Sequence, residues 1–220
     1  MTAEYRDGRD KALTDYPRPS VAVDTAVLTY ETDGGLLVLQ VRRSTGAGWA
    51  LPGTFLHPGE TLARAVRRSL RDKANVDGID PRQLHVFDRI GRDDRGWVLS
   101  VGHVAVVPLE QLAERDPDNT RLVPAATPGR LAFDHEDIIE MALTDLQSRY
   151  LDRPDPDRLL GETFTLRQLR QVHEAVDGAE IGPDKLDTFR RRMQERLIRV
   201  TGNPVRPEGR GRPAQRFRRC

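Results

Sequence analysis

The spacing of apolar residues divides the first 150 residues into strand-like runs and two helical stretches. Short runs rich in β-branched residues predict strands, and apolar residues three and four positions apart predict amphipathic helices. The predicted strands are 21–30, 36–41, 84–90 and 97–107, and the predicted helices are 61–74 and 134–150. A turn signal at Asp33 to Gly35 predicts a hairpin between the first two strands. The stretch 115–131, rich in proline, aspartate and alanine, is expected to be a loop.

The pattern changes after 151–158, where two prolines and several charges indicate a linker. Thr165 and Gln168 have the spacing of a helix capping box, and Gly178 is a typical helix end. Pro183 suits the first turn of a second helix.

An apolar stripe and two short strands complete this second region. The stripe of the second helix consists of Leu186, Phe189, Met193 and Leu197. Strand-like pieces at 197–201 and 214–218 flank a loop rich in glycine, proline and arginine. The order of helix, turn, helix and basic hairpin is typical of a winged helix-turn-helix.

These elements predict an α+β protein in two parts. The predicted divisions are an N-terminal arm at 1–18, a first domain at 19–150, a linker at 151–161 and a second domain at 162–220. The net charge of +1 hides an asymmetry, because residues 161–220 carry +6 and the rest of the chain carries −5. An acidic and a basic part suggest two domains with different partners.

Several function classes are disfavoured by the bulk sequence. No apolar run approaches the length needed to span a bilayer, so no membrane partner is expected. The charged N-terminus does not resemble a secretory signal, and the single cysteine, Cys220, closes no disulfide within the chain. These observations predict a cytoplasmic protein.

One motif carries most of the chemical information. The run LPGTFLHPGE at 51–60 precedes the helix 61–74, and by itself it is compatible with an ordinary turn before an amphipathic helix. It resembles the Nudix box, whose pattern is G-x5-E-x7-R-E-U-x-E-E-x-G-U, with U an aliphatic residue. Glu60 and Arg68 match the pattern, whereas its two glycines fall on Thr54 and Asn75. The three remaining acids of the pattern fall on Ser69, Asp72 and Lys73.

The replaced acids would lie on one helix face, at i, i+3 and i+4. In the Nudix family that face holds magnesium, which prefers carboxylate oxygens. One carboxylate beside an ammonium is a poor magnesium site, so the resemblance implies neither catalytic nor metal-binding residues here and no required cofactor. Lys73 is instead suited to contact a phosphate directly. A weak hydrolase that uses Asp72 and an acid from elsewhere stays a second interpretation.

The rest of the chain resembles the Nudix-related transcriptional regulators, the NrtR-type repressors of NAD metabolism. The matching segments are RDDRG at 92–96, LAFDH at 131–135, FTL at 164–166, FRR at 189–191 and GRPA at 211–214. The resemblance implies a Nudix-like α/β/α sandwich followed by a winged helix. It also implies a homodimer that binds double-stranded operator DNA of NAD biosynthesis or salvage genes and responds to ADP-ribose or a related nucleotide.

The expected effector-binding residues are Arg42, Arg43, Trp49, Phe55, His57, Glu60, Arg68, Asp72 and Lys73. The rings of Trp49 and Phe55 have two alternative roles, stacking on a base or packing in the core. The expected DNA-binding residues are Lys185, Thr188, Arg190, Arg191, Arg192, Arg206, Arg210 and Arg212. A solvated helix face with a basic tail would share this pattern. His135 has the position of a capping or packing residue more than of a catalytic one.

Two other functions remain as alternatives. The first is a Nudix pyrophosphatase that acts on ADP-ribose-like nucleotides and carries an accessory basic domain. The second is a nucleotide-binding module whose basic end contacts protein or RNA. Steep salt dependence would distinguish duplex DNA from a protein partner.

Overall fold

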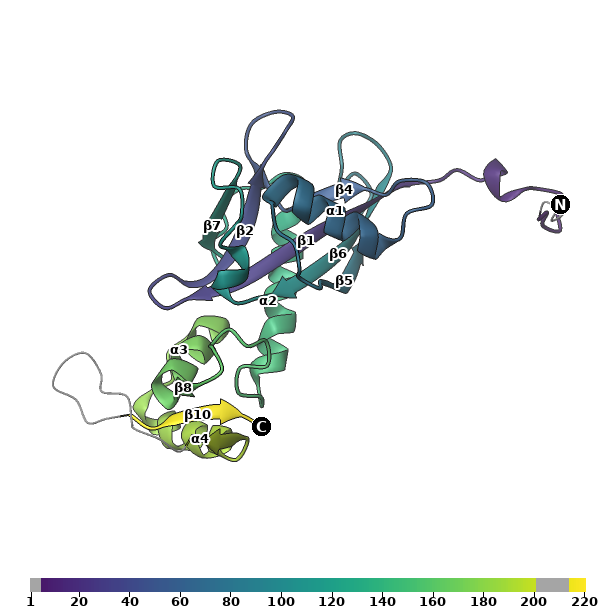
Figure 1. The fold of residues 1–220 in the computed structure, drawn as a ribbon. Helices are drawn as coiled ribbons and strands as arrows, with labels where there is room; N and C mark the ends of the chain where they lie inside the picture. The colour runs from purple at the N-terminus through teal and green to yellow at the C-terminus, as the bar shows by residue number, and fades with distance from the viewer. Residues whose placement is uncertain (1–4, 201–213) are drawn as a thin grey trace.

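A twisted sheet with a helix on each face forms the larger part of the molecule (Figure 1). The computed structural model describes residues 5–200 and 214–220. The sheet follows the order β3-β2-β1-β6-β5, with β4 pairing β1 and β7 pairing β2. Its strands are β1 (Ser20–Glu31), β2 (Gly35–Arg42), β3 (Trp49–Ala50), β4 (Gly53–Phe55), β5 (Arg82–Phe87), β6 (Val98–Val106) and β7 (Thr120–Pro124).

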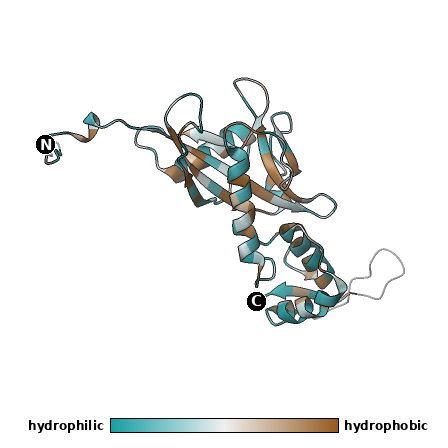
Figure 2. Ribbon diagram, turned by 180° about the vertical axis from the view of Figure 1, so that it is seen from behind, coloured by the Kyte–Doolittle hydropathy of each residue, from teal (hydrophilic) through white to brown (hydrophobic). Residues whose placement is uncertain are grey.

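Alternation along β1 builds a core on each face of this sheet. Ala26 and Leu28 pack with helix α2 (His135–Tyr150) in one cluster, whereas Val23 and Val27 pack with helix α1 (Leu62–Ala74) in another. Successive side chains of a strand point to opposite faces, so the two helices sandwich the sheet. The strands are accordingly the most apolar elements of the fold (Figure 2). The expected α/β/α sandwich is confirmed.

The main predicted elements form close to their expected bounds. β1 and β2 pair antiparallel through the predicted hairpin, and β1 lies parallel to β6. Helix α1 begins where the Thr61 hydroxyl accepts a hydrogen bond from the backbone N–H of Arg64 at 3.3 Å. It ends at Asn75, whose φ of 51° is left-handed.

The expectation of a loop throughout 115–131 was wrong. Residues Thr120–Pro124 form β7, which pairs antiparallel with β2 from Thr120 opposite Val41 to Pro124 opposite Leu37. The local preference of this short stretch for strand structure is weak, and pairing with a distant strand is what stabilises it as a strand. Two 3-10 turns, η1 (Leu13–Asp15) and η2 (Leu109–Leu112), were also absent from the sequence prediction. η1 lies in an N-terminal arm that extends away from the sandwich (Figure 1).

The C-terminal module is a winged helix. Its elements are β8 (Phe164–Thr165), α3 (Leu166–Asp177), α4 (Pro183–Gln194), β9 (Leu197–Arg199) and β10 (Arg216–Arg219), and the sheet order is β8-β10-β9. The predicted capping box is present, because the Thr165 hydroxyl accepts from the Gln168 N–H while the Gln168 side chain accepts from the Thr165 N–H. β10 begins two residues later than the predicted strand, and β8 was not predicted.

The segment between the two parts is packed rather than extended. It contains no helix or strand, but the Asp155 side chain within it is fully buried and Leu159 joins the core under α2. That core continues into the winged helix through Val172 and Val176 of α3. The two parts therefore share apolar packing, and the division at 151–161 remains a prediction. Within the described ranges, no helix is long and apolar enough to cross a membrane.

Candidate effector site and nucleic-acid surface

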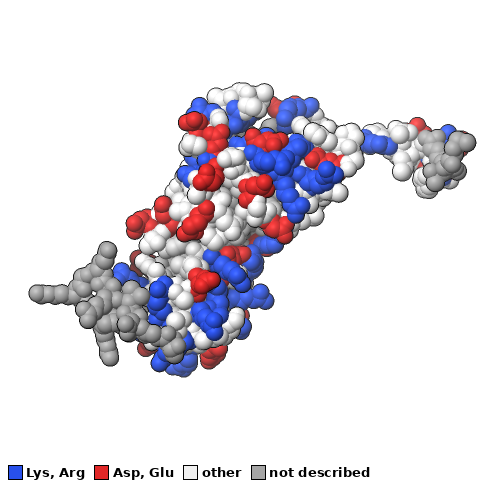
Figure 3. Space-filling view, viewed as in Figure 1, with Lys and Arg blue, Asp and Glu red and all other residues white. Residues whose placement is uncertain are grey.

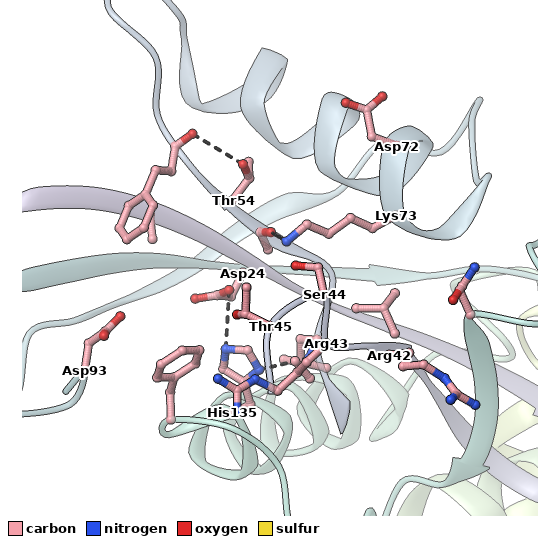
Figure 4. Close-up of a pocket in the computed structure, with 18 of the residues that line it drawn as sticks. Asp24, Arg42, Arg43, Ser44, Thr45, Thr54, Asp72, Lys73, Asp93 and His135 are labelled. Carbon is pink, nitrogen blue, oxygen red and sulfur yellow. Dashed lines mark hydrogen bonds and ion pairs between the residues drawn. The ribbon is translucent and has the colours of Figure 1, made fainter. Parts of the chain in front are cut away.

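A cavity of about 380 Å³ opens between the Nudix-box segment and the N-terminus of α2 (Figure 4). Its wall combines the end of β2, strand β4, the α1 face and the loop 92–95. The charged and aromatic residues among its lining are Asp24, Arg42, Arg43, Phe55, Asp72, Lys73, Arg92, Asp93, Arg95, Asp116, Phe133 and His135.

The floor of the cavity is a buried polar cluster centred on Asp24 of β1. Asp24 accepts a hydrogen bond from the Ser100 hydroxyl at 2.6 Å, and its other oxygen lies 3.3 Å from His135 Nε2. His135 Nδ1 accepts from the Leu51 N–H at 2.9 Å, so Nε2 is the ring nitrogen that faces Asp24. Arg92 lies 3.7 Å from Asp24. Burial opposes the charge of Asp24, but His135, Ser100 and Arg92 outweigh it and hold the pKa of the carboxyl below its usual range.

Arg92 also fixes the start of α2. Its Nε donates to Asp134 Oδ2 at 2.9 Å, and Nη2 donates to the other carboxylate oxygen. Both side chains are almost fully buried, so this bidentate pair is shielded from solvent. The pair ties the loop 92–95 to the residue that precedes α2.

Gly53 of β4 is the antiparallel partner of Asp24 on β1, and its missing side chain leaves room for the carboxylate. A Cβ placed at Gly53 would lie 1.8 Å from Asp24 Oδ1, so no other residue fits without a displacement. The Gly53 carbonyl accepts a hydrogen bond from Lys73 Nζ, which extends from α1 across the cavity (Figure 4). Desolvation lowers the pKa of the Lys73 ammonium.

The Nudix-box helix does not present a magnesium site. Ser69 is buried, and its hydroxyl has no hydrogen-bond partner in the part of the chain that the structure describes. Lys73 places an ammonium in the cavity, and Asp72 is the one carboxylate on this helix. Across residues 5–200 and 214–220, no cluster of three or more His, Cys, Asp or Glu side chains has a metal-binding arrangement. The residues present therefore do not fit the metal of the Nudix reaction.

Glu60 and Arg68 brace the loop against α1 instead of lining the cavity. Arg68 donates to Glu60 Oε1 at 2.9 Å and Oε2 at 2.8 Å, and also to the Phe55 carbonyl at 2.9 Å. Glu60 in turn accepts from the His57 N–H at 3.0 Å. The hydrogen bonds from Arg68, with that from His57, lower the pKa of Glu60 to about 2.

The predicted effector residues therefore fall into two groups. Arg42, Arg43, Phe55, Asp72 and Lys73 line the cavity, whereas Trp49, His57, Glu60 and Arg68 lie outside its wall. Trp49 instead packs against the core under α2, with the guanidinium groups of Arg42 and Arg121 over its ring.

The sequence prediction missed much of the cavity. The omitted residues with charged or aromatic side chains include Asp24, Asp93, Arg95, Phe133 and His135. The resemblance of 92–96 and 131–135 to the family was the available signal for most of them. Asp24 had none, because a single acid in a β-branched run reads as the solvent face of a strand.

Several basic residues of the winged helix lie where DNA contact is expected. Arg190 and Arg191 are exposed on α4, and Arg190 lies 3.8 Å from Asp187. Many basic side chains, with acidic ones among them, cover this module in Figure 3. Arg206, Arg210 and Arg212 lie outside the described residues.

The other flank of α4 faces the rest of the protein. Lys185, Thr188 and Arg192 line a smaller cavity of about 290 Å³, which Tyr150 of α2 and His173 of α3 also line. These three predicted DNA contacts thus lie at the junction between the two parts of the molecule. No pattern in the sequence predicted this junction.

Comparison with known proteins accounts for both parts of the chain. A family model described as the NUDIX domain matches residues 20–145, and one described as the NrtR DNA-binding winged helix domain matches residues 157–218. The chain belongs to the NrtR branch of the Nudix family. The crystal structure of Shewanella oneidensis NrtR complexed with a 27mer DNA is 32% identical, with a TM-score of 0.73, and the match covers 91% of this chain and 93% of that one.

Other relatives differ in how much of the chain they match. The ADPR responsive transcriptional repressor NtrR of Acinetobacter baylyi is 29% identical over 93% of this chain and 84% of its own length. The NUDIX domain of Shewanella oneidensis NrtR, in a structure complexed with ADP ribose, is 30% identical with a TM-score of 0.54, covering 63% of this chain and 95% of that one. An ADP-ribose pyrophosphatase of Methanocaldococcus jannaschii is 32% identical but covers 57% of this chain and 73% of its own length. The two NrtR-type proteins thus match both parts of the chain, and the pyrophosphatase matches one.

Proposed function

We propose that this NrtR-type protein is a transcriptional repressor of NAD biosynthesis or salvage genes that binds ADP-ribose or a related nucleotide as its effector. The observation that carries the proposal is a cavity lined by arginine and lysine side chains, with no metal-binding acid cluster among the described residues, joined to a winged helix. The Acinetobacter baylyi relative is an ADPR responsive repressor, and the Shewanella oneidensis NrtR structures contain DNA or ADP ribose.

The cavity supports nucleotide binding through its chemistry. Arg42, Arg43 and Lys73 bring three cationic side chains into the cavity, where a pyrophosphate would find donors. Phe55 and Phe133 offer ring faces to a base. Asp24 and Asp93 supply acceptors for ribose hydroxyls or base amines.

The same cavity argues against hydrolysis. Magnesium-assisted attack on a pyrophosphate needs several carboxylates around the metal, and the box helix offers Asp72 alone beside Lys73. We therefore propose that the effector is held and released unchanged, with no metal or cofactor required. The opposing candidate, a pyrophosphatase with an accessory basic domain, predicts magnesium-dependent release of AMP from ADP-ribose that Asp72→Ala abolishes.

The proposed partners are a second copy of the chain and double-stranded operator DNA. A homodimer would place two copies of α4 on a two-fold symmetric site. Light scattering of the purified protein tests the dimer, and a monomer at DNA-binding concentrations would contradict it.

A titration of promoter DNA at fixed salt tests the repressor. Fluorescence anisotropy with a labelled promoter fragment of an NAD gene should show binding that ADP-ribose weakens by about 5- to 150-fold, the usual range of allosteric coupling. Binding that ADP-ribose leaves unchanged would contradict ADP-ribose as the effector. Failure to bind any such promoter would contradict the repressor itself.

Two variants separate the two sites. Arg42→Ala should weaken the ADP-ribose response without changing DNA affinity, because Arg42 lines the cavity far from α4. Arg121→Ala is its matched control, since that guanidinium also stacks on Trp49 but lies outside the cavity wall. Arg191→Ala should weaken DNA binding and lower the salt slope by about 1, as expected for one lost phosphate contact.

A further inference from the structure

The loop RDDRG at 92–96 places a charged side chain, that of Arg95, at the cavity. Gly91 and Gly96 at its ends have φ values of 77° and 144°, which favour glycine. Between them Asp93 is buried, whereas the Arg95 side chain is 54% exposed. The loop thus fixes one carboxylate in the wall and presents a guanidinium at the mouth of the cavity.

Arg95 lies against two aromatic rings at once. Its Cζ is 4.9 Å from the ring centre of Phe55 and 4.7 Å from that of Phe133. The two rings come from different elements, Phe55 from β4 and Phe133 from the turn before α2. Phe133 has a left-handed φ of 60°, which is unfavourable for a bulky residue. Strained backbone conformations of this kind are found preferentially at ligand sites.

The edge of the guanidinium is held by Asp93. Arg95 Nε and Nη2 donate to the two carboxylate oxygens at 2.9 Å and 2.7 Å, and the Arg95 backbone N–H donates at 2.9 Å. Asp93 is 4% exposed, so without a donor in this place its carboxylate would be buried with too few hydrogen bonds to offset its loss of water. Whatever replaces the guanidinium must therefore be planar and must carry N–H donors on its edge.

A purine base with an exocyclic amine meets both requirements. Its faces stack on aromatic rings as a guanidinium does, and its amine donates to a carboxylate. We infer that Arg95 occupies the subsite for the effector's amino-purine base in the free protein. The base enters between Phe55 and Phe133, displaces Arg95 and donates its amine to Asp93. This inference rests on the proposed function, because it assigns one moiety of the proposed effector.

Internal competition of this kind has an unusual consequence for affinity. Removing a side chain that lines a ligand cavity ordinarily weakens binding, but removing Arg95 abolishes the need to displace it. Arg95→Ala should therefore bind adenosine, which has no phosphate to attract a cation, about tenfold more tightly than the wild type, as expected if Arg95 leaves the subsite open in about a tenth of the wild-type molecules. Arg95→Lys keeps the charge but loses the planar stacking and two-point pairing, so it should also bind adenosine more tightly.

Isothermal titration calorimetry of the full chain tests this inference. Adenosine, purine riboside and ADP-ribose are titrated into the wild type, the two Arg95 variants and Arg121→Ala. The last variant removes a guanidinium that stacks on Trp49 outside the cavity, and its affinities should equal those of the wild type. Purine riboside lacks the amine, so it should bind more weakly than adenosine to both Arg95 variants. Thermal unfolding of each variant verifies that the fold is retained.

The outcomes separate this inference from the proposed function. If the wild type binds ADP-ribose but both Arg95 variants bind adenosine equally or more weakly, the displacement of Arg95 is overturned and the effector stands. If Arg95→Lys behaves as the wild type while Arg95→Ala binds more tightly, charge alone decides and the stacking role is overturned. Equal affinity for adenosine and purine riboside overturns the role of Asp93. Absence of ADP-ribose binding to the wild type overturns both the effector and this inference.

Discussion

An ion pair between the buried Asp155 and the partly exposed Arg219 should hold the winged helix to the rest of the protein. Asp155 accepts hydrogen bonds from the Tyr150 hydroxyl at 3.0 Å, from the N–H groups of Leu159 and Leu160 at 2.8 and 2.9 Å, and from Arg219. Arg219 comes from β10, and it also donates to the Leu160 carbonyl at 3.2 Å. Substituting Arg219→Ala leaves the carboxylate buried with its three other donors.

The expected destabilisation follows from this geometry. Removing one partner of a buried ion pair typically costs about 3–5 kcal/mol, and three remaining hydrogen bonds place Arg219→Ala near the lower end, about 3 kcal/mol. For a protein of this size, about 2–4 °C in Tm corresponds to each kcal/mol, so Tm should fall by roughly 6–12 °C. Arg218→Ala removes the exposed neighbour on the same strand, and we expect Tm to change by less than about 2 °C.

Differential scanning calorimetry at several pH values provides the assay. Burial raises the pKa of Asp155, and the loss of Arg219 should raise it further. A folded-state pKa above the unfolded value gives stability that is present at low pH and lost as pH rises. The deficit of Arg219→Ala should therefore shrink as pH falls from 7 toward 4. A loss equal to that of Arg218→Ala, or a deficit independent of pH, would refute the buried pair.

Three further predictions concern other parts of the molecule. Burial lowers the pKa of His173 from 6.5 to about 4, so the wild type should lose stability as pH falls from 6.5 to 4, by up to about 1.4 kcal/mol per pH unit. His173→Leu should flatten that part of the urea-unfolding curve against pH, and an unchanged slope would contradict the assignment. The pKa of Glu60 is lowered from 4.5 to about 2, so stability should fall as pH falls between these values. Unfolding followed by circular dichroism should show this loss of stability in the wild type and not in Glu60→Gln. Gly53→Ala would bring Cβ against Asp24 and should lower stability by about 1–3 kcal/mol and weaken ADP-ribose binding, whereas Gly161→Ala, with open space where its Cβ would lie, should change neither.

Local signals determined how much of the fold the sequence could predict. Capping residues and turn glycines act within a few positions, so the helix that begins after Thr165 and the β1–β2 hairpin were found. β7 was missed because its five residues become a strand through pairing with β2, more than 70 residues away. The compact junction at Asp155 was missed for the same reason, since a partner on β10 is what makes burial of that carboxylate possible.

The cavity shows the same limit in its chemistry. The Nudix-box resemblance identified Lys73 and Phe55, which line the cavity, but it also placed Glu60 and Arg68 among the effector-binding residues, and these brace the loop instead. It could not identify Asp24, which becomes part of the site because β4 pairs beside it and Gly53 leaves room for its carboxylate. Tertiary packing brings such residues into the site, and a motif that spans one loop and one helix does not include them.

Helix α2 joins the two sites of the proposed repressor in one rigid element. Its 16 residues span about 24 Å at 1.5 Å per residue. At its start the buried Asp134–Arg92 pair connects it to the loop that carries Arg95. At its end the Tyr150 ring packs edge-on against His173, and His173 against Phe189 of α4, with ring centres 5.1 Å apart in each pair. A base that displaces Arg95 would act on this helix through the adjoining Arg92. Allosteric coupling free energies are typically about 1–3 kcal/mol, which is no more than a few such contacts contribute. A small shift of α2 would therefore be enough to change the placement of α4.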